Sequence, residues 1–149
     1  MKKYIGTKMI EATPMSRGDY NRYRGWTIPA DENPADEGYL VKYSDGYESW
    51  SPKKQFEEAY RECDNMTFGL AIEMMKKGKK VARKGWNGKG QYIQLATGIS
   101  YKLGAGKIVN CTHEDIGNKA IAFIGTSGVQ MGWLASQADM LAEDWIVVK

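Results

Sequence analysis

One well-marked helix followed by short strands is the sequence feature that most restricts how this chain can fold. Its apolar residues recur at the i, i+3, i+4, i+7 spacing of a helix with one buried face, at Phe68, Ala71, Ile72 and Met75. Thr67 stands where a side chain can cap the helix, and Gly78 stands where a left-handed residue commonly ends one. We therefore expect a helix between these two residues.

Short apolar segments, some separated by glycine turns, come after this helix. The expected strands are residues 80–83, 91–96, 120–124, 129–134 and 146–148, with the turns GWNGKG and GTSG between some of them. One helix with several short strands predicts an α+β fold in which the helix packs on an antiparallel β-sheet. We assign this domain to residues 63–149.

Residues 1–62 form an N-terminal extension that we expect to be small and mixed α/β. The expected elements are a strand at 3–12, a helix at 16–24 capped by Ser16, strands at 39–43 and 47–50 joined by an Asp45-Gly46 turn, and a helix at 52–61 that Pro52 opens. The stretch TIPADENPADEG, rich in proline and acid, is expected to be a loop. No function is assigned to this extension from its residues.

Composition points to a small protein of the cytosol. The chain has 149 residues, no apolar run near the ~20 residues that cross a bilayer, and no apolar signal-peptide segment after its N-terminal lysines. Its two cysteines, Cys63 and Cys111, form no metal-type pair, and we expect free thiols. We therefore expect a cytosolic protein that does not enter a membrane.

Positive charge gathers in the second domain. Residues 1–60 carry 9 Lys/Arg and 10 Asp/Glu, whereas residues 61–149 carry 12 and 8. Most of the excess lies between residues 76 and 89. Such a stretch favours an anionic partner such as a phosphate, although charge runs more often form a solvated surface.

No pattern of a catalytic or metal site is present in the sequence. Cys111, His113, Glu114 and Asp115 lie close together, but they lack the spacing of zinc ligands, and His113 is the only histidine. The chain has no G-x-S-x-G, Walker, dinucleotide-binding or H-E-x-x-H motif. We therefore expect neither catalysis nor a bound metal or cofactor.

Aromatic and polar residues of the second domain supply the parts of a nucleotide-binding site. Flat faces for stacking on a base are offered by Phe68, Trp86, Tyr92 and Trp133. Phosphates could be contacted by Arg83, Lys84 and Lys89, and a purine edge could be contacted by Asn87. Two of these rings are more often core residues than platforms for a ligand: Phe68 lies on the apolar face of the helix, and Trp133 alternates with Met131 along an expected strand. Trp86 is the exception, because its glycine-rich loop gives it no evident core to fill.

The segment WLASQADMLAEDW adds polar groups to this set. Ser136 and Asp139 match the S-x-x-D spacing of a helix cap. Gln137 and Asp144 have no evident local partner. A carboxylate at Asp144 could accept hydrogen bonds from ribose hydroxyls or from a base amine.

Two motifs of the chain resemble those of one protein family. MTFGLAIEMMKKGKKVARKGWNGKGQYI, and WLASQADMLAEDWIVV near the end of the chain, resemble the second type of Thoeris anti-defence sponges, which are small proteins of phages and prophages. The resemblance covers roughly residues 66–148, with both motifs in the family's order. It leaves the first 65 residues as an extension that resembles one seen on other small phage proteins.

What the resemblance implies is sequestration of an immune signal inside an infected bacterium. Such proteins bind, without cleaving, a cyclic ADP-ribose isomer that TIR-domain proteins make, and the downstream effector stays off. Some also hold cyclic dinucleotides. They are homo-oligomers, usually dimers of dimers, whose ligand pockets are shared between subunits. The implied ligand-binding positions are Phe68, Trp86, Asn87, Trp133, Ser136, Gln137, Asp139 and Asp144, to which the reasoning from the residues adds Arg83 and Tyr92.

Departures from the family and other functions remain open at this point. Ala138 stands where a polar residue is common in the family, and Gln91 stands where an apolar residue is usual. The residues also fit a module that binds single-stranded nucleic acid, which the modest net charge of +3 disfavours. A nucleotide hydrolase and a structural phage protein that binds only other proteins are the remaining alternatives.

Overall fold

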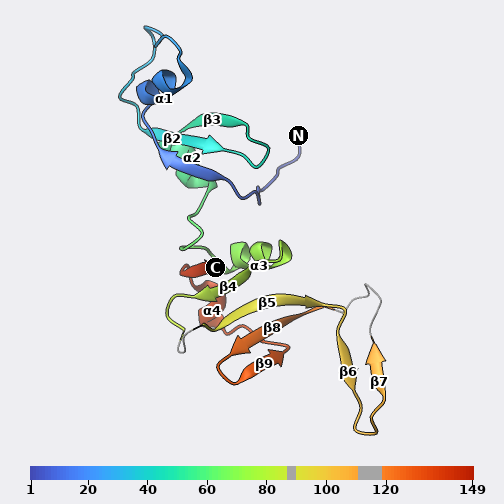
Figure 1. Cartoon of the computed structure of the whole chain (residues 1–149). Helices are drawn as coiled ribbons and strands as arrows, with labels where there is room; N and C mark the ends of the chain where they lie inside the picture. Colours follow the sequence, from blue (N-terminus) through green and yellow to red (C-terminus); the bar gives the residue numbers. More distant parts are fainter. Residues whose placement is uncertain (87–89, 111–118) are drawn as a thin grey trace. The chain divides into compact units, whose positions relative to one another are not determined.

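The computed structural model describes residues 1–86, 90–110 and 119–149 (Figure 1). The chain divides into two compact units, Met1–Arg61 and Glu62–Lys149, here called unit 1 and unit 2. None of the helices in the described ranges is long and apolar enough to cross a membrane.

Unit 1 is a three-stranded antiparallel sheet with two helices. The strands β1 (Glu11–Pro14), β2 (Gly38–Lys42) and β3 (Glu48–Pro52) lie in the order β1-β2-β3. Helix α1 (Arg17–Arg24) begins as expected at Ser16, whose hydroxyl accepts the Asp19 N–H at 3.2 Å. Helix α2 (Lys53–Ala59) follows β3 directly, and Phe56 from α2 stacks on Tyr39 from β2 with ring centroids 4.0 Å apart. Unit 1 is therefore mixed α/β.

The strand expected at residues 3–12 is wrong over most of its length. Strand β1 begins only at Glu11, which pairs with Lys42, the last residue of β2. Beyond Lys42 the chain turns back between Tyr43 and Tyr47, where Tyr43 N–H donates to the Tyr47 carbonyl at 2.8 Å. Because β2 ends there, residues before Glu11 find no strand to pair with.

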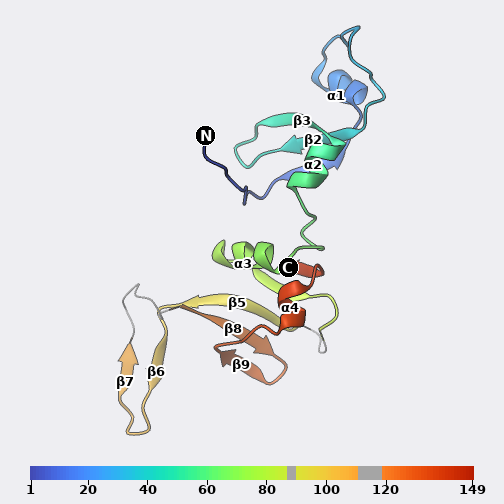
Figure 2. The same ribbon diagram turned by 180° about the vertical axis from the view of Figure 1, so that it is seen from behind.

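Unit 2 contains a five-stranded antiparallel sheet covered by one helix (Figures 1 and 2). Its strands lie in the order β10-β4-β5-β8-β9, with bounds Trp145–Val148, Lys80–Arg83, Tyr92–Thr97, Lys119–Gly125 and Gly128–Met131. The last strand of the chain therefore pairs with the first strand of this unit. The expected α+β fold, a helix on an antiparallel sheet, is confirmed.

Helix α3 (Phe68–Lys76) begins and ends as the sequence predicts. The Thr67 hydroxyl accepts the Leu70 N–H at 3.3 Å, and Gly78 adopts a positive φ of 82°. The helix and the sheet enclose the core of unit 2, whose buried members are Met66, Ala71, Met74, Met75, Val81, Ile93 and Trp145. Burial of these side chains is the main stabilising contribution to the unit.

One hairpin of unit 2 was not predicted from the sequence. Strands β6 (Ser100–Lys102) and β7 (Ile108–Asn110) form a separate two-stranded hairpin, which extends away from the main sheet in both views (Figures 1 and 2). Helix α4 (Gln137–Leu141) is a short helix before β10, and it follows Ser136, the cap residue that the sequence indicated.

The strand expected at residues 129–134 ends early, at Met131. Gly132 has a φ of 88°, and the N–H groups of Gly132 and Trp133 both donate to the Ile121 carbonyl, at 3.0 and 2.9 Å. The chain therefore leaves the sheet edge at Gly132. Trp133 lies after the strand, which corrects the expectation that it alternates with Met131 along it.

Candidate ligand-binding site

Aromatic rings from five separate segments meet in unit 2. We call Phe68, Trp86, Phe123, Trp133 and Trp145 the aromatic cluster. The Trp86 ring lies 5.7 Å from Phe123, 5.8 Å from Trp133 and 5.4 Å from Trp145, measured between ring centroids. Phe68 lies 5.3 Å from Trp145 and 6.5 Å from Trp133. These spacings are typical of tilted and edge-to-face aromatic packing.

The rings of the aromatic cluster differ in how accessible they are. Trp145 is fully buried, at 0% exposure, and is one of the core residues of unit 2. Phe68, Trp86 and Trp133 are half-buried and pack against the core around it. Three of the four residues predicted to stack on a base therefore lie together, next to the buried ring of Trp145.

The expectation that Trp86 has no core to fill is wrong. Its backbone leaves β4 in a turn, where the Trp86 N–H donates to the Arg83 carbonyl at 3.3 Å. This turn brings the indole over Trp145 of β10 and Phe123 of β8, which lie far away in the sequence. Phe123 was missed as a site residue, because its place depends on its pairing with Ile93 across β5 and β8.

Tyr92 does not belong to the aromatic cluster. Its neighbour Ile93 is buried in the core, and successive side chains of a strand point to opposite faces. Tyr92 therefore lies on the other face of the sheet, where the Lys80 ammonium is 4.9 Å from its ring centroid. The structure thus separates Tyr92 from the three predicted residues that it brings together.

A network of charged side chains lies beside the aromatic cluster. Arg83 Nη1 donates to Asp139 Oδ1 at 3.0 Å, and Arg83 Nε and Nη2 donate to the two oxygens of Asp144 at 2.9 and 3.4 Å. The sequence offered Asp144 no evident local partner, and its partner Arg83 indeed lies 61 positions earlier in the chain. Three residues predicted to bind ligand are thus bound to one another.

The Ser136–Asp139 capping box is confirmed. The Asp139 carboxylate accepts the Ser136 N–H at 3.0 Å and the Ser136 hydroxyl at 2.7 Å, while the Asp139 N–H donates back to Ser136 Oγ at 3.1 Å. Gln137, another predicted site residue, is the exposed first residue of α4. It lies next to this network.

Ionisation of the network follows from its contacts. Burial opposes the charge on Asp139, but the hydrogen bonds from Ser136 and Arg83 outweigh it and lower the pKa of Asp139 below its ordinary value. The carboxylates of Asp144 and Asp139 raise the pKa of Arg83. Asp139 and Arg83 therefore both carry their charges at neutral pH.

Some of the predicted residues fall outside the described ranges. These are Asn87, Lys89, Cys111, His113, Glu114 and Asp115. Lys84 is described, and its ammonium donates to Asn65 Oδ1 at 2.7 Å. The described residues contain no group of three or more His, Cys, Asp or Glu side chains placed to hold a metal ion.

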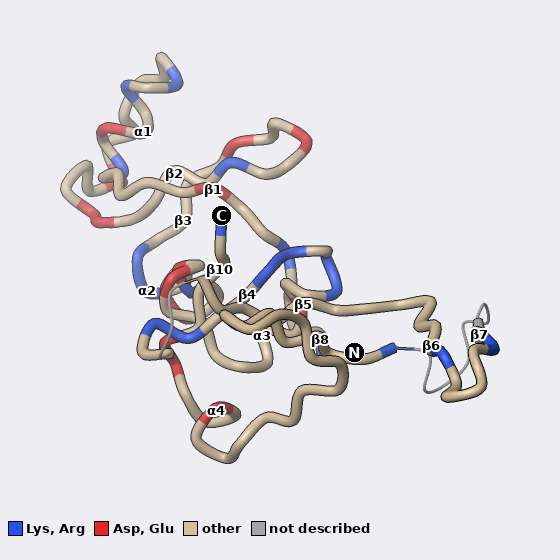
Figure 3. The backbone as a smooth tube through the Cα atoms, turned by 60° about the horizontal axis from the view of Figure 1, so that its bottom comes forward, with Lys and Arg blue, Asp and Glu red and all other residues tan. Residues whose placement is uncertain are grey.

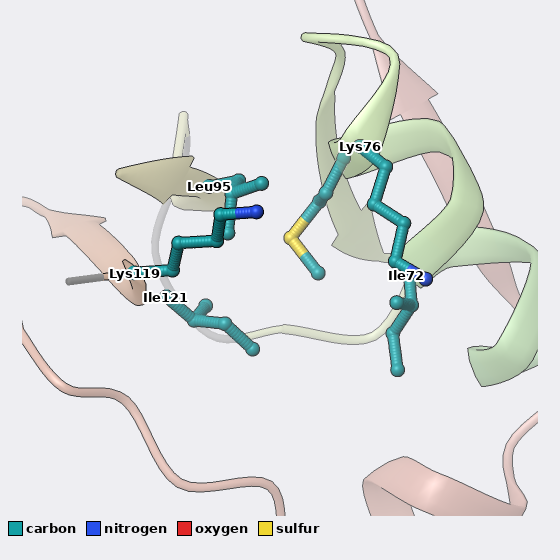
Figure 4. A pocket seen from close by; sticks show the side chains of 6 residues that line it. Ile72, Lys76, Leu95, Lys119 and Ile121 are labelled. Carbon is teal, nitrogen blue, oxygen red and sulfur yellow. The ribbon is translucent and has the colours of Figure 1, made fainter. Parts of the chain in front are cut away.

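A cavity of about 230 Å³ lies apart from the predicted residues (Figure 4). Its walls are apolar side chains from α3, β5 and β8, with two lysines beside them: Ile72, Met75, Leu95, Ile121, Lys76 and Lys119. None of the sequence-predicted ligand-binding residues lines it. The sequence indicates these apolar residues by their helical spacing and strand alternation. It does not indicate the cavity, because the residues come together only when α3 packs on the sheet.

Comparison with known proteins identifies the family of this chain. Residues 66–148 match the model of the Thoeris anti-defense 2-like domain. The chain belongs to this family. Thoeris anti-defense 2 of Bacillus phage SP01 is 40% identical over 88 residues, which is 56% of this chain and 94% of the phage protein. The resemblance seen in the sequence motifs is therefore confirmed.

Membership of the Thoeris anti-defense 2-like family supports a phage anti-Thoeris function. The family match covers the aromatic cluster and the charged network, and it begins at Met66, close to the start of unit 2. Unit 1 lies outside it.

Proposed function

We propose that unit 2 binds and sequesters, without cleaving it, a cyclic ADP-ribose isomer made by TIR-domain proteins, and thereby blocks Thoeris-type immunity. The observation that carries this proposal is the aromatic cluster, in which Phe68, Trp86 and Trp133 remain half-buried beside a buried Trp145. Stacking of a base on an aromatic ring contributes about 1–3 kcal/mol. Two indole rings at one site suit a ligand that carries an adenine base.

Binding without cleavage is supported by the ionisation of the neighbouring groups. A general base works best when its pKa lies near the operating pH, and the pKa of Asp139 is lowered, away from neutrality. Arg83 and the two carboxylates also bind one another rather than facing a substrate. Asp139 is therefore poorly suited to accept a proton at neutral pH.

A homo-oligomer is the second part of the proposal, with each pocket shared between copies in a dimer of dimers. Large apolar side chains are exposed on β9, on α4 and between them: Val129, Met131, Leu134, Met140 and Leu141. Leu134 is 90% exposed and Leu141 73% exposed, and both lie close in sequence to Trp133 or the capping box. A second copy covering this surface would bury it and enclose the half-buried rings.

Substitution of Trp86 tests the ligand. Purified protein is incubated with lysate from infected cells that carry a TIR-domain defence system, washed and denatured, and the released small molecules are identified by mass spectrometry. Wild-type protein is expected to release an intact cyclic ADP-ribose isomer, and Trp86→Ala to release at least about 10-fold less, since one base loses its stacking partner. Trp26→Ala is the matched control, because Trp26 is a 53% exposed tryptophan of unit 1.

The same experiment separates the alternative functions. If cyclic dinucleotides are released, the proposed ligand is wrong and the proposed sequestration still holds. Release of a linear product would indicate a hydrolase. Lysines at the end of α3 and the start of β4 form a basic stretch (Figure 3), so single-stranded oligonucleotides are titrated in parallel. Oligonucleotide affinity that falls steeply with salt would favour a nucleic-acid module instead.

A further inference from the structure

One carboxylate links the segments that carry the two half-buried tryptophans. Arg83 stands three residues before Trp86, and Ser136, the cap of α4, stands three residues after Trp133. The Arg83 guanidinium and the Ser136 hydroxyl both donate to Asp139, at 3.0 and 2.7 Å. The backbone next to one indole is thus connected through Asp139 to the backbone next to the other.

A second carboxylate extends the connection to the floor of the site. Arg83 Nε donates to Asp144 Oδ1 at 2.9 Å, and Asp144 directly precedes the buried Trp145. The indole N–H of Trp145 donates in turn to the Asp139 carbonyl at 2.9 Å. Arg83 therefore lies where the Trp86 turn, the start of α4 and the start of β10 meet.

We propose that Arg83 is the positioning residue of this site: through Asp139 and Asp144 it fixes the spacing and tilt of Trp86 and Trp133, and it does not contact the ligand. The proposal rests on the proposed function, because it concerns the same aromatic site. Positioning by a planar guanidinium suits this geometry, since its fork can bind two carboxylates at once, whereas an ammonium acts as a single point charge.

Charge argues against a phosphate-binding role for Arg83. Its Nε, Nη1 and Nη2 atoms all donate to carboxylates. One cation with two anions carries a local charge of −1, which repels a phosphate. This reverses the expectation from the sequence, in which Arg83 contacts a phosphate and Asp144 contacts a ribose or a base.

The first test needs no ligand. Arg83→Lys keeps the charge but cannot span both carboxylates, so the coupled tryptophan bands in the near-ultraviolet circular dichroism spectrum are expected to weaken. The matched control is Arg22→Lys, because Arg22 also binds an aspartate, Asp19, but at an exposed site of unit 1. Asp144→Asn removes one partner and keeps the arginine, so it serves if Arg83→Lys fails to fold. It is expected to change the same bands to a smaller extent.

The second test measures affinity for a purified cyclic ADP-ribose isomer by calorimetry. Arg83→Lys is expected to bind about 10-fold more weakly. The double variant Arg83→Lys/Asp144→Asn is expected to bind more tightly than the product of the two single effects predicts, because both changes break the same contact between Arg83 and Asp144. A loss of affinity with an unchanged spectrum would mean direct ligand contact and would overturn the proposal. Unchanged affinity in Arg83→Lys would overturn it as well.

Failure of the two proposals can be told apart. If wild-type protein does not bind the isomer, the proposed function is wrong, whatever the spectra show. If wild-type protein binds the isomer and Arg83→Lys leaves both the spectrum and the affinity unchanged, only the positioning role is wrong.

Discussion

At the scale of single residues, the Asp139 carboxylate contributes stability that depends on pH. Its pKa is lowered in the folded protein, so the unfolded chain binds its proton more readily. The contribution is therefore complete above the ordinary pKa of an aspartate, near 4, and is lost as the pH falls through the lower, folded value.

Asp139→Asn tests this contribution to stability. The change removes the carboxylate and weakens its bonds with Arg83 and Ser136, so the melting temperature is expected to fall by about 5 °C at pH 7. The difference from wild type should shrink below about pH 4, where the wild-type carboxylate also takes up a proton. Thermal unfolding followed by circular dichroism from pH 2.5 to 7 measures it, and a difference that stays constant over this range would contradict the prediction.

Residue pairing in the charged network could not be predicted from the sequence, although the residues were singled out. Arg83 lies 56 positions from Asp139 and 61 from Asp144, so only the folded sheet brings them together. Ser136 and Asp139 lie three apart, and their cap was predicted correctly because its geometry is local. The partners of Trp86 were missed for the same reason as those of Arg83.

At the scale of elements, helix α3 was predicted because both of its ends are set by nearby residues. Gly78 ends it at a φ of 82°, and an added Cβ would meet nothing within 4 Å. Gly78→Ala should therefore lower the free energy of unfolding by about 1 kcal/mol through backbone strain alone. Urea unfolding measures this, with Gly104→Ala as the control, since Gly104 is also open but does not have a positive φ.

Elements without local end signals were predicted less well. The β6–β7 hairpin was not predicted. The strand that ends at Met131 was predicted three residues too long, because the chain leaves the sheet edge at Gly132, where the N–H groups of Gly132 and Trp133 both donate to the Ile121 carbonyl. That carbonyl belongs to a strand about ten positions earlier in the chain. The order of strands in the sheet likewise depends on contacts between distant segments, and only its antiparallel character followed from the sequence.

At the scale of the whole molecule, the family match begins at Met66 and the matched phage protein is covered over 94% of its length by this chain. Unit 2 also holds its own buried core, with members from α3, β4, β5 and β10. A fragment of residues 62–149 is therefore expected to fold cooperatively and to bind the cyclic ADP-ribose isomer within about 3-fold of the full chain. Calorimetry on both proteins measures this. A fragment that folds but does not bind would assign unit 1 a part in the site.

Self-association is the last property expected of the whole molecule, and Leu141 is the residue best placed to test it. Leu141 is 73% exposed on α4, next to the Ser136–Asp139 cap, where a second copy would cover both the apolar surface and the rings beside it. Leu141→Glu places a charge there, which a buried interface disfavours. We expect light scattering after gel filtration to show a smaller species and calorimetry to show weaker binding of the isomer. Leu103→Glu, at an exposed leucine in the turn that joins β6 to β7, should leave both unchanged. An intact oligomer in Leu141→Glu would place the interface on another surface and leave the half-buried rings to be enclosed by the ligand itself.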